Sequence, residues 1–174
     1  MRIELQSGIT LQSGTFNAVI APERVIISAL NSHADLQRFL FLFVCGNYSR
    51  ILSSISRTSA NFEVRRAFTA HQLFTIVKEA GHTIVFIEHD PTMFDGAETM
   101  IMPVSAALRD AGREALVILY TPSMDHPFSA LARSADRIFQ ITPAGDPSCH
   151  RHRSARPYPP GGPLPPAQTT LEVS

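Results

Sequence analysis

Apolar residues along this chain gather in short continuous runs, separated by segments with helical spacing. Three of the runs are almost wholly apolar: Phe39–Cys45 (FLFLFVC), Thr83–Ile87 (TIVFI) and Ala115–Tyr120 (ALVILY). A strand with one wet face alternates apolar and polar residues, and these runs do not alternate. They therefore predict central strands of a sheet that is covered on both faces.

Weaker patterns extend this sheet and place helices between its strands. Further strands are predicted over Thr15–Ala21, Phe62–Phe68 and Arg137–Ile141, with a hairpin or edge strand over Ile3–Ser13. Helices are predicted over Glu23–Leu36, Ser49–Thr58, Thr69–Ala80, Pro103–Ala111 and Ser129–Ala135. The repeated strand–helix order favours an α/β fold with a mostly parallel sheet and helices on both faces.

Two of these helices carry clear end signals. Thr69 can cap its helix, Gln72 follows three residues on as in a capping box, and Gly81 can end it. Pro103 suits the first turn of the later helix, and Gly112 suits its end.

The composition changes near Gly145. Residues 1–145 form the predicted domain, whereas Asp146–Ser174 hold seven of the chain's 13 prolines and few large aliphatic residues. Such a segment cannot bury enough apolar surface to offset its ordering entropy, so we predict a mostly disordered tail. Its last stretch, Gln168–Val173, is the part best suited to dock on the domain as an edge strand.

Composition and charge narrow the functional classes. Fifteen basic residues balance fifteen acidic ones, so no overall field draws the protein to nucleic acid or to anionic lipid. The two cysteines make no disulfide framework, and no apolar run approaches the roughly 20 residues of a membrane helix. No leader pattern opens the chain, and we expect a cytoplasmic protein with no membrane partner.

One pattern in the middle of the chain resembles a known family. The run Phe62–Leu73 (FEVRRAFTAHQL), followed by the strand that ends in Glu88-His89-Asp90, is similar to the central part of archaeal RecA/RadA-like ATPases. Leu131–Ile138 (LARSADRI) resembles the segment before a late core strand in that family. The likeness implies a RecA-like P-loop NTPase fold, with Glu88–Asp90 at the position of the Walker B acid.

The phosphate-binding loop of that family is missing. There the first strand leads into a glycine-rich loop ending in Gly-Lys-Ser/Thr, whose amides and lysine hold the phosphates. Here the first strand leads into Ala21-Pro22-Glu23-Arg24-Val25, without glycine and with an acidic residue. The only lysine, Lys78, lies inside a predicted helix. We therefore expect a degenerate member of the fold that does not hydrolyse ATP.

Polar residues at the strand ends are the candidate site residues. Glu88, His89 and Asp90 follow a central strand, where open α/β sheets place ligands. Glu88 or Asp90 would hold Mg²⁺, and His89 would act as an acid or base. The alternative, which we favour, is that this acidic strand end only caps the following turn.

Neighbouring loops offer further candidates at the same edge. A bound nucleotide would contact Glu88, Asn47 and Arg24, and Asn47 with Arg50 suits an anion. A metal site of His89, Asp90, Asp125 and His126 is conceivable if these loops converge, although no tight ligand spacing supports it. Cys149, His150 and His152 resemble a metal cluster only superficially, because three ligands in four residues strain tetrahedral geometry and a fourth is not evident. We interpret His150–Arg156 (HRHRSAR) instead as a basic patch able to bind nucleic acid weakly.

The resemblance and the missing loop together give two functional hypotheses. The first is a non-catalytic RecA-like accessory or scaffold protein, paired with a protein partner such as an active homologous ATPase. Family analogy alone links it to DNA and to recombination or repair. The second is a nucleotide-binding protein or hydrolase that uses the Glu88–Asp90 strand end without a normal phosphate loop. Mg²⁺ and a nucleotide are implied only by the second hypothesis, and the cofactor is otherwise unknown.

Overall fold

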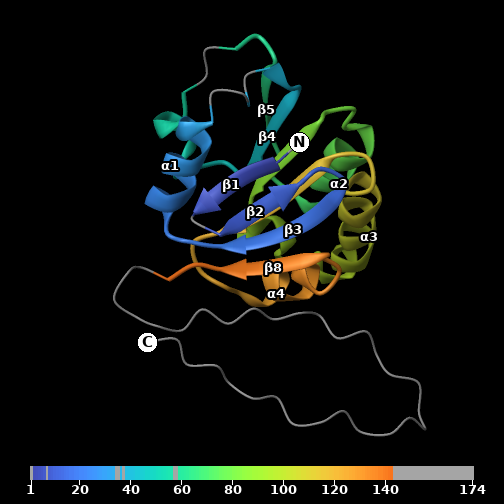
Figure 1. Ribbon diagram of the computed structural model, residues 1–174. Coiled ribbons are helices and arrows are strands. Elements are labelled where there is room, and N and C mark those ends of the chain that lie inside the picture. Colours follow the sequence, from blue (N-terminus) through green and yellow to red (C-terminus); the bar gives the residue numbers. More distant parts are fainter. Residues whose placement is uncertain (1, 7, 34–35, 37, 57–58, 143–174) are drawn as a thin grey trace, which may run out of the picture.

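A computed structural model of the chain (Figure 1) describes residues 2–6, 8–33, 36, 38–56 and 59–142. Six parallel strands form one sheet in the order β5-β4-β6-β7-β3-β8. The strands are β3 (Thr15–Ile20), β4 (Phe41–Cys45), β5 (Phe62–Arg66), β6 (Ile84–Glu88), β7 (Leu116–Thr121) and β8 (Arg137–Gln140). The predicted α/β fold with a parallel sheet is confirmed.

The three apolar runs form the centre of this sheet. Every residue of β4, β6 and β7 is buried, and Phe86 and Leu119 are fully buried as predicted. The outer strands β5 and β8 are partly exposed. Position in the sheet therefore follows the continuity of the apolar run.

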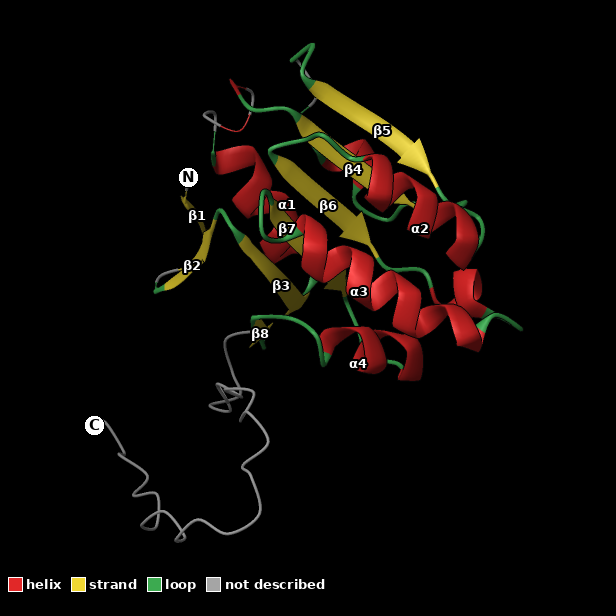
Figure 2. Cartoon of the chain, turned by 90° about the vertical axis from the view of Figure 1, so that its right-hand side faces the viewer, coloured by secondary structure: helices red, strands yellow, loops and turns green. Residues whose placement is uncertain are grey.

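Three helices cover one face of the sheet. They are α2 (Ala70–Glu79), α3 (Ile101–Ala111) and α4 (His126–Ala132), and they bury apolar side chains against Ile87, Val117 and Leu119. Figure 2 shows these helices in front of the strands. Gly112, after α3, lies so close to β3 that an added Cβ would come within 2.9 Å of the Phe16 backbone nitrogen.

The other face is covered by helix and hairpin together. Helix α1 (Glu23–Ser32), the short 3-10 helix η2 (Leu52–Ser54) and the antiparallel strands β1 (Arg2–Gln6) and β2 (Ile9–Gln12) pack there against Phe43, Phe86 and Tyr120. The predicted hairpin is confirmed, and helices lie on both faces of the sheet as expected, with the hairpin sharing the cover of the α1 face.

Several predicted helix bounds were also wrong. Helix α1 ends at Ser32 rather than Leu36. Only η2 forms within Ser49–Thr58, whose residues 57–58 lie outside the described residues, because Asn31 bonds to Ser54 O and Ser56 N in place of helical partners. Helix α4 begins three residues early because the Asp125 side chain caps it at Phe128 N.

Connections leave the central strands toward opposite faces. The chain passes to the α1 side after β3 and β4, but to the α2–α4 side after β6 and β7. Adjacent strands whose connections diverge in this way leave a crevice at their carboxyl ends. We call this end of the sheet, with the loops that follow β3 to β7, the carboxyl edge. No helix in the described part of the chain is long and apolar enough to cross a membrane.

Candidate functional site

Glu88 ends β6 at the carboxyl edge, and its side chain is buried (5% exposed). The Ser49 hydroxyl donates a hydrogen bond to Oε2, and the Arg50 backbone N–H donates to Oε1 at 2.8 Å. Ser49 Oγ in turn accepts from Leu52 N at 2.9 Å, which starts η2. Burial raises the pKa of Glu88, and these two hydrogen bonds oppose the rise. Both carboxylate oxygens therefore hold the loop that follows β4.

His89 points to the opposite face and is also buried. Its Nε2 lies 2.8 Å from Asp125 Oδ2, and its ring packs edge-on against Phe128 at 5.5 Å between centroids. The other Asp125 oxygen caps α4 through Phe128 N at 2.8 Å. Burial lowers the pKa of His89, although the Asp125 charge opposes this shift. His89 thus orients the cap of α4 rather than facing the crevice.

Asp90 caps the next turn. Its Oδ1 accepts from Thr92 N at 3.0 Å and from Thr92 Oγ1 at 2.7 Å, which starts the 3-10 helix η3 (Pro91–Phe94). The other carboxylate oxygen of Asp90, Oδ2, lies close to Gly46 in the loop after β4. A Cβ added to Gly46 would lie 2.1 Å from this oxygen. This close approach requires glycine at position 46.

The other candidate nucleotide contacts are not gathered around Glu88. Asn47 and Arg24 are exposed, and no described hydrogen bond joins either side chain to Glu88. Arg50 reaches Glu23 Oε1 at 3.5 Å, and Arg66 donates to the carbonyls of the Gly46-Asn47 turn. These arginines hold loops at the carboxyl edge.

The connection from β3 to α1 leaves no room for a phosphate loop. Only Ala21 and Pro22 separate the strand from the helix, and Ala21 is buried. Pro22 occupies the N-cap position and provides no side-chain cap. Without glycines or a lysine here, the residues do not fit Mg²⁺-nucleotide held in the manner of a P-loop.

Neither candidate metal set is assembled in the described part of the chain. Among the described residues, no three or more His, Cys, Asp or Glu side chains are grouped so as to hold a metal ion. His89 and Asp125 do meet, but as a pair. The set of Cys149, His150 and His152 lies outside the described residues.

Tyr120 is the site residue that sequence reasoning missed. It pairs with Glu88 across β6 and β7, is fully buried, and its hydroxyl has no hydrogen-bond partner among the described residues. Burial raises its pKa, and the charges of Glu23 and Glu88 raise it further. Its position at the end of an apolar run concealed it, because a tyrosine there is indistinguishable from a core aromatic.

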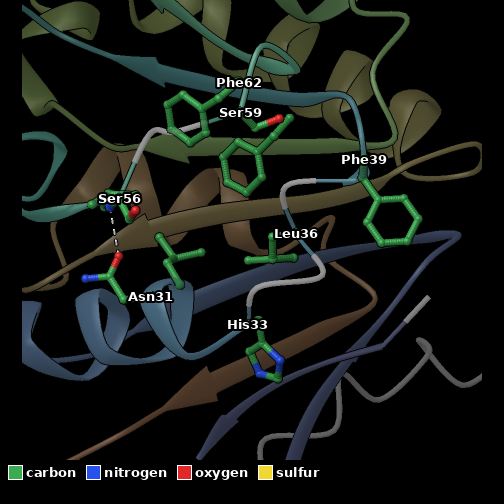
Figure 3. A pocket seen from close by; sticks show the side chains of 10 residues that line it. Asn31, His33, Leu36, Phe39, Ser56, Ser59 and Phe62 are labelled. Atoms are coloured by element: carbon green, nitrogen blue, oxygen red, sulfur yellow. Dashed lines mark hydrogen bonds between the residues drawn. The ribbon is translucent and has the colours of Figure 1, made fainter.

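A separate pocket lies at the opposite end of the sheet, where β4 and β5 begin (Figure 3). Its volume is about 90 Å³, and its lining is mainly apolar: Leu30, Asn31, His33, Leu36, Phe39, Phe41, Ile55, Ser56, Ser59 and Phe62. His33 Nε2 is bonded to the Glu4 backbone. The Asn31 side chain donates a hydrogen bond to Ser54 O and accepts one from Ser56 N. The pocket brings together no group of reactive side chains, so the carboxyl edge remains the candidate site.

Comparison with known proteins gives a relative without an assigned activity. No family model matches the chain. Over 129 residues it is 40% identical to an uncharacterized protein from Archaeoglobus fulgidus. The alignment covers 74% of this chain and 65% of that protein, so the chain spans less than two thirds of the length of this relative.

Proposed function

We propose that this chain is a degenerate RecA-like domain that acts as a non-catalytic accessory or scaffold protein. The observation that carries the proposal is the bonding of Glu88. In a working site, an acid at this strand end would face a metal ion and its water ligands. Here each oxygen accepts a hydrogen bond from the Ser49-Arg50 loop, and the side chain is buried.

The neighbouring groups support the same interpretation. His89 and Asp90 are both used in capping, one through Asp125 and the other through Thr92. The two-residue connection from β3 to α1 cannot encircle a phosphate. Resemblance over Phe62–Leu73 supplies the proposed partner class, an active RecA-like ATPase, and the proposed link to DNA recombination or repair.

One observation favours a second candidate function, the binding of a nucleotide at this edge by another route. Tyr120 is the register partner of Glu88, and its buried hydroxyl has no hydrogen-bond partner among the described residues. The two residues lie at the carboxyl ends of β6 and β7, which are between the two places in the sheet where strand connections diverge and where α/β sheets bind ligands. A ligand that entered the crevice would satisfy this hydroxyl. It would also have to displace the Ser49 bond to Glu88, so we rank this function second.

Hydrolysis assays separate the two functions. Purified full-length protein with Mg²⁺ and ATP or GTP should release no phosphate above the buffer control. Turnover that is present in the wild type and lost in Glu88→Gln would refute the non-catalytic proposal. Leu40→Gln, at the opposite edge, is a matched control that should leave any true turnover unchanged.

The accessory role is tested by affinity capture from the native cell. We expect a RecA-type ATPase to be recovered, and its hydrolysis rate to change when the purified chain is added. Recovery without any effect on the rate, or no such ATPase among the captured proteins, would contradict the role.

A further inference from the structure

Large apolar side chains are exposed mainly at the carboxyl edge. Among the described residues, five large hydrophobic side chains are exposed, and Leu40 is the one that lies at the opposite edge. The other four are Phe68 (52%), Tyr48 (85%), Met102 (74%) and Met124 (54%), and we call them the apolar row. Exposed apolar groups gathered on one surface mark interaction sites.

The sheet order and the direction of α3 place the members of the apolar row at the same end of the sheet. Phe68 follows β5, Tyr48 follows β4, Met102 lies in the first turn of the helix after β6, and Met124 follows β7. These four strands are consecutive neighbours in the sheet. With strands about 4.8 Å apart, the ends of these four strands span roughly 14 Å along the edge, and Met102 lies beside them in the helix layer, at the start of α3. The arrowheads of β5 and β6 in Figure 2 point toward this end of the sheet.

Charges of opposite sign border the two sides of the row. On the α1 side lie the exposed Arg24 and Arg50, which we call the basic flank. On the α3 side lie the exposed Asp95 and Glu98, the acidic flank, in the connection between β6 and α3. Arg24 and both acidic residues have no ion-pair partner among the described residues. Arg50 is paired with Glu23 at 3.5 Å, so Arg24 carries the available charge of the basic flank, and Asp95 and Glu98 carry that of the acidic flank.

We propose that the carboxyl edge binds a second copy of this chain as a two-fold symmetric dimer. A two-fold axis along the apolar row brings the row of one copy onto the row of the other. The same rotation places the basic flank of each copy against the acidic flank of its partner, so the surface is self-complementary. Tyrosine, phenylalanine, methionine and arginine are also the residues enriched in protein interfaces.

The first test is the mass of the full chain in solution. Sedimentation equilibrium at concentrations up to about 100 μM should give twice the 19.1 kDa of one chain. Tyr48→Ser and Met102→Gln should each raise the dimer Kd at least about tenfold, because truncated central anchors weaken interfaces most. Leu40→Gln is the matched control and should leave the Kd unchanged. A wild-type chain that stays monomeric over this range would overturn the proposal.

A charge reversal tests the symmetry itself. Arg24→Glu with Arg50→Glu makes both flanks acidic, and Asp95→Arg with Glu98→Arg makes both basic. Each variant alone should fail to dimerise, and an equimolar mixture of the two should form the mixed dimer. All four side chains are exposed, and the Arg50 bond to Glu88 uses the backbone. Arg50→Glu also removes an exposed ion pair with Glu23, which contributes little to stability, so thermal melts should show that both variants fold. Two variants that dimerise as the wild type does would overturn the assigned axis. None of these measurements uses nucleotide or a captured partner, so they succeed or fail independently of the accessory role.

Discussion

The contact between Gly46 and Asp90 offers a sharp test of how the carboxyl edge is closed. A Cβ placed on Gly46 would lie 2.1 Å from Asp90 Oδ2 and 2.9 Å from both Asp90 Cβ and Cγ. Side-chain rotation can move the oxygen, but the Cβ contact remains unless the backbone shifts. Gly46→Ala therefore forces apart the loops that follow β4 and β6, the two loops that Glu88 joins.

The expected loss of stability follows from this overlap. Overpacking of a close-packed region by one carbon destabilises by about 1–3 kcal/mol. For a chain of this size each kcal/mol lowers Tm by about 2–4 °C, so Gly46→Ala should melt about 2–12 °C below the wild type. Asp90→Gly removes all three contacting atoms, so adding Gly46→Ala to that variant should lower Tm much less.

Circular dichroism melts of the four proteins of this cycle measure the effect. Gly81→Ala is the matched control, because no atom lies within 4 Å of its added Cβ, and it should melt within a degree or two of the wild type. The reasoning would be refuted if Gly46→Ala melted no lower than Gly81→Ala. It would also be refuted if Asp90→Gly gave no relief.

Three further predictions concern the core, one buried histidine and the tail. Phe86→Ala or Leu119→Ala should lower the free energy of unfolding by about 2–5 kcal/mol in urea titrations, and a loss below about 0.5 kcal/mol would contradict a sheet covered on both faces. Burial lowers the pKa of His89 below 6.5, so the unfolded chain binds more protons just below pH 6.5 and stability falls as the pH drops toward the lowered pKa. His89→Gln should flatten that part of the stability curve, and an unchanged slope would show that another group causes it. Deleting residues 146–174 should leave a cooperative melt, whereas loss of cooperativity would show that the tail docks on the domain.

The sheet could be predicted from the sequence because its signal is local. Continuous apolar runs over Phe39–Cys45 and Ala115–Tyr120 identify strands that are buried on both faces, and the structure buries every residue of the strands that form there, β4 and β7. Helix α2 was found because Thr69 and Gln72 mark its start, and the Thr69 side chain does accept from Gln72 N. Strand order was not predictable, since it depends on pairings between segments far apart in the chain.

The role of the strand-end residues required the structure. Glu88, His89 and Asp90 are consecutive, but Glu88 meets Ser49 while His89 meets Asp125, on opposite faces. Because successive side chains of a strand point to opposite faces, the sequence predicts that Glu88 and His89 separate, but it does not predict which residues they contact. The helix predicted over Ser49–Thr58 was also wrong because of contacts between distant segments. The hydrogen bonds of this region to Asn31 outweigh its local helix propensity.

Nucleotide binding tests the central claim, that the carboxyl edge is closed to Mg²⁺-nucleotide, most directly. Isothermal titration of the full chain with ATP and Mg²⁺, up to about 1 mM nucleotide, should give no saturable heat, with an active P-loop ATPase in the same buffer as positive control. Thermal melts at the same concentrations should show no rise in Tm, because only a ligand that prefers the folded state raises it. Saturable binding that raises Tm in the wild type and disappears in both Glu88→Gln and Tyr120→Phe would contradict the account.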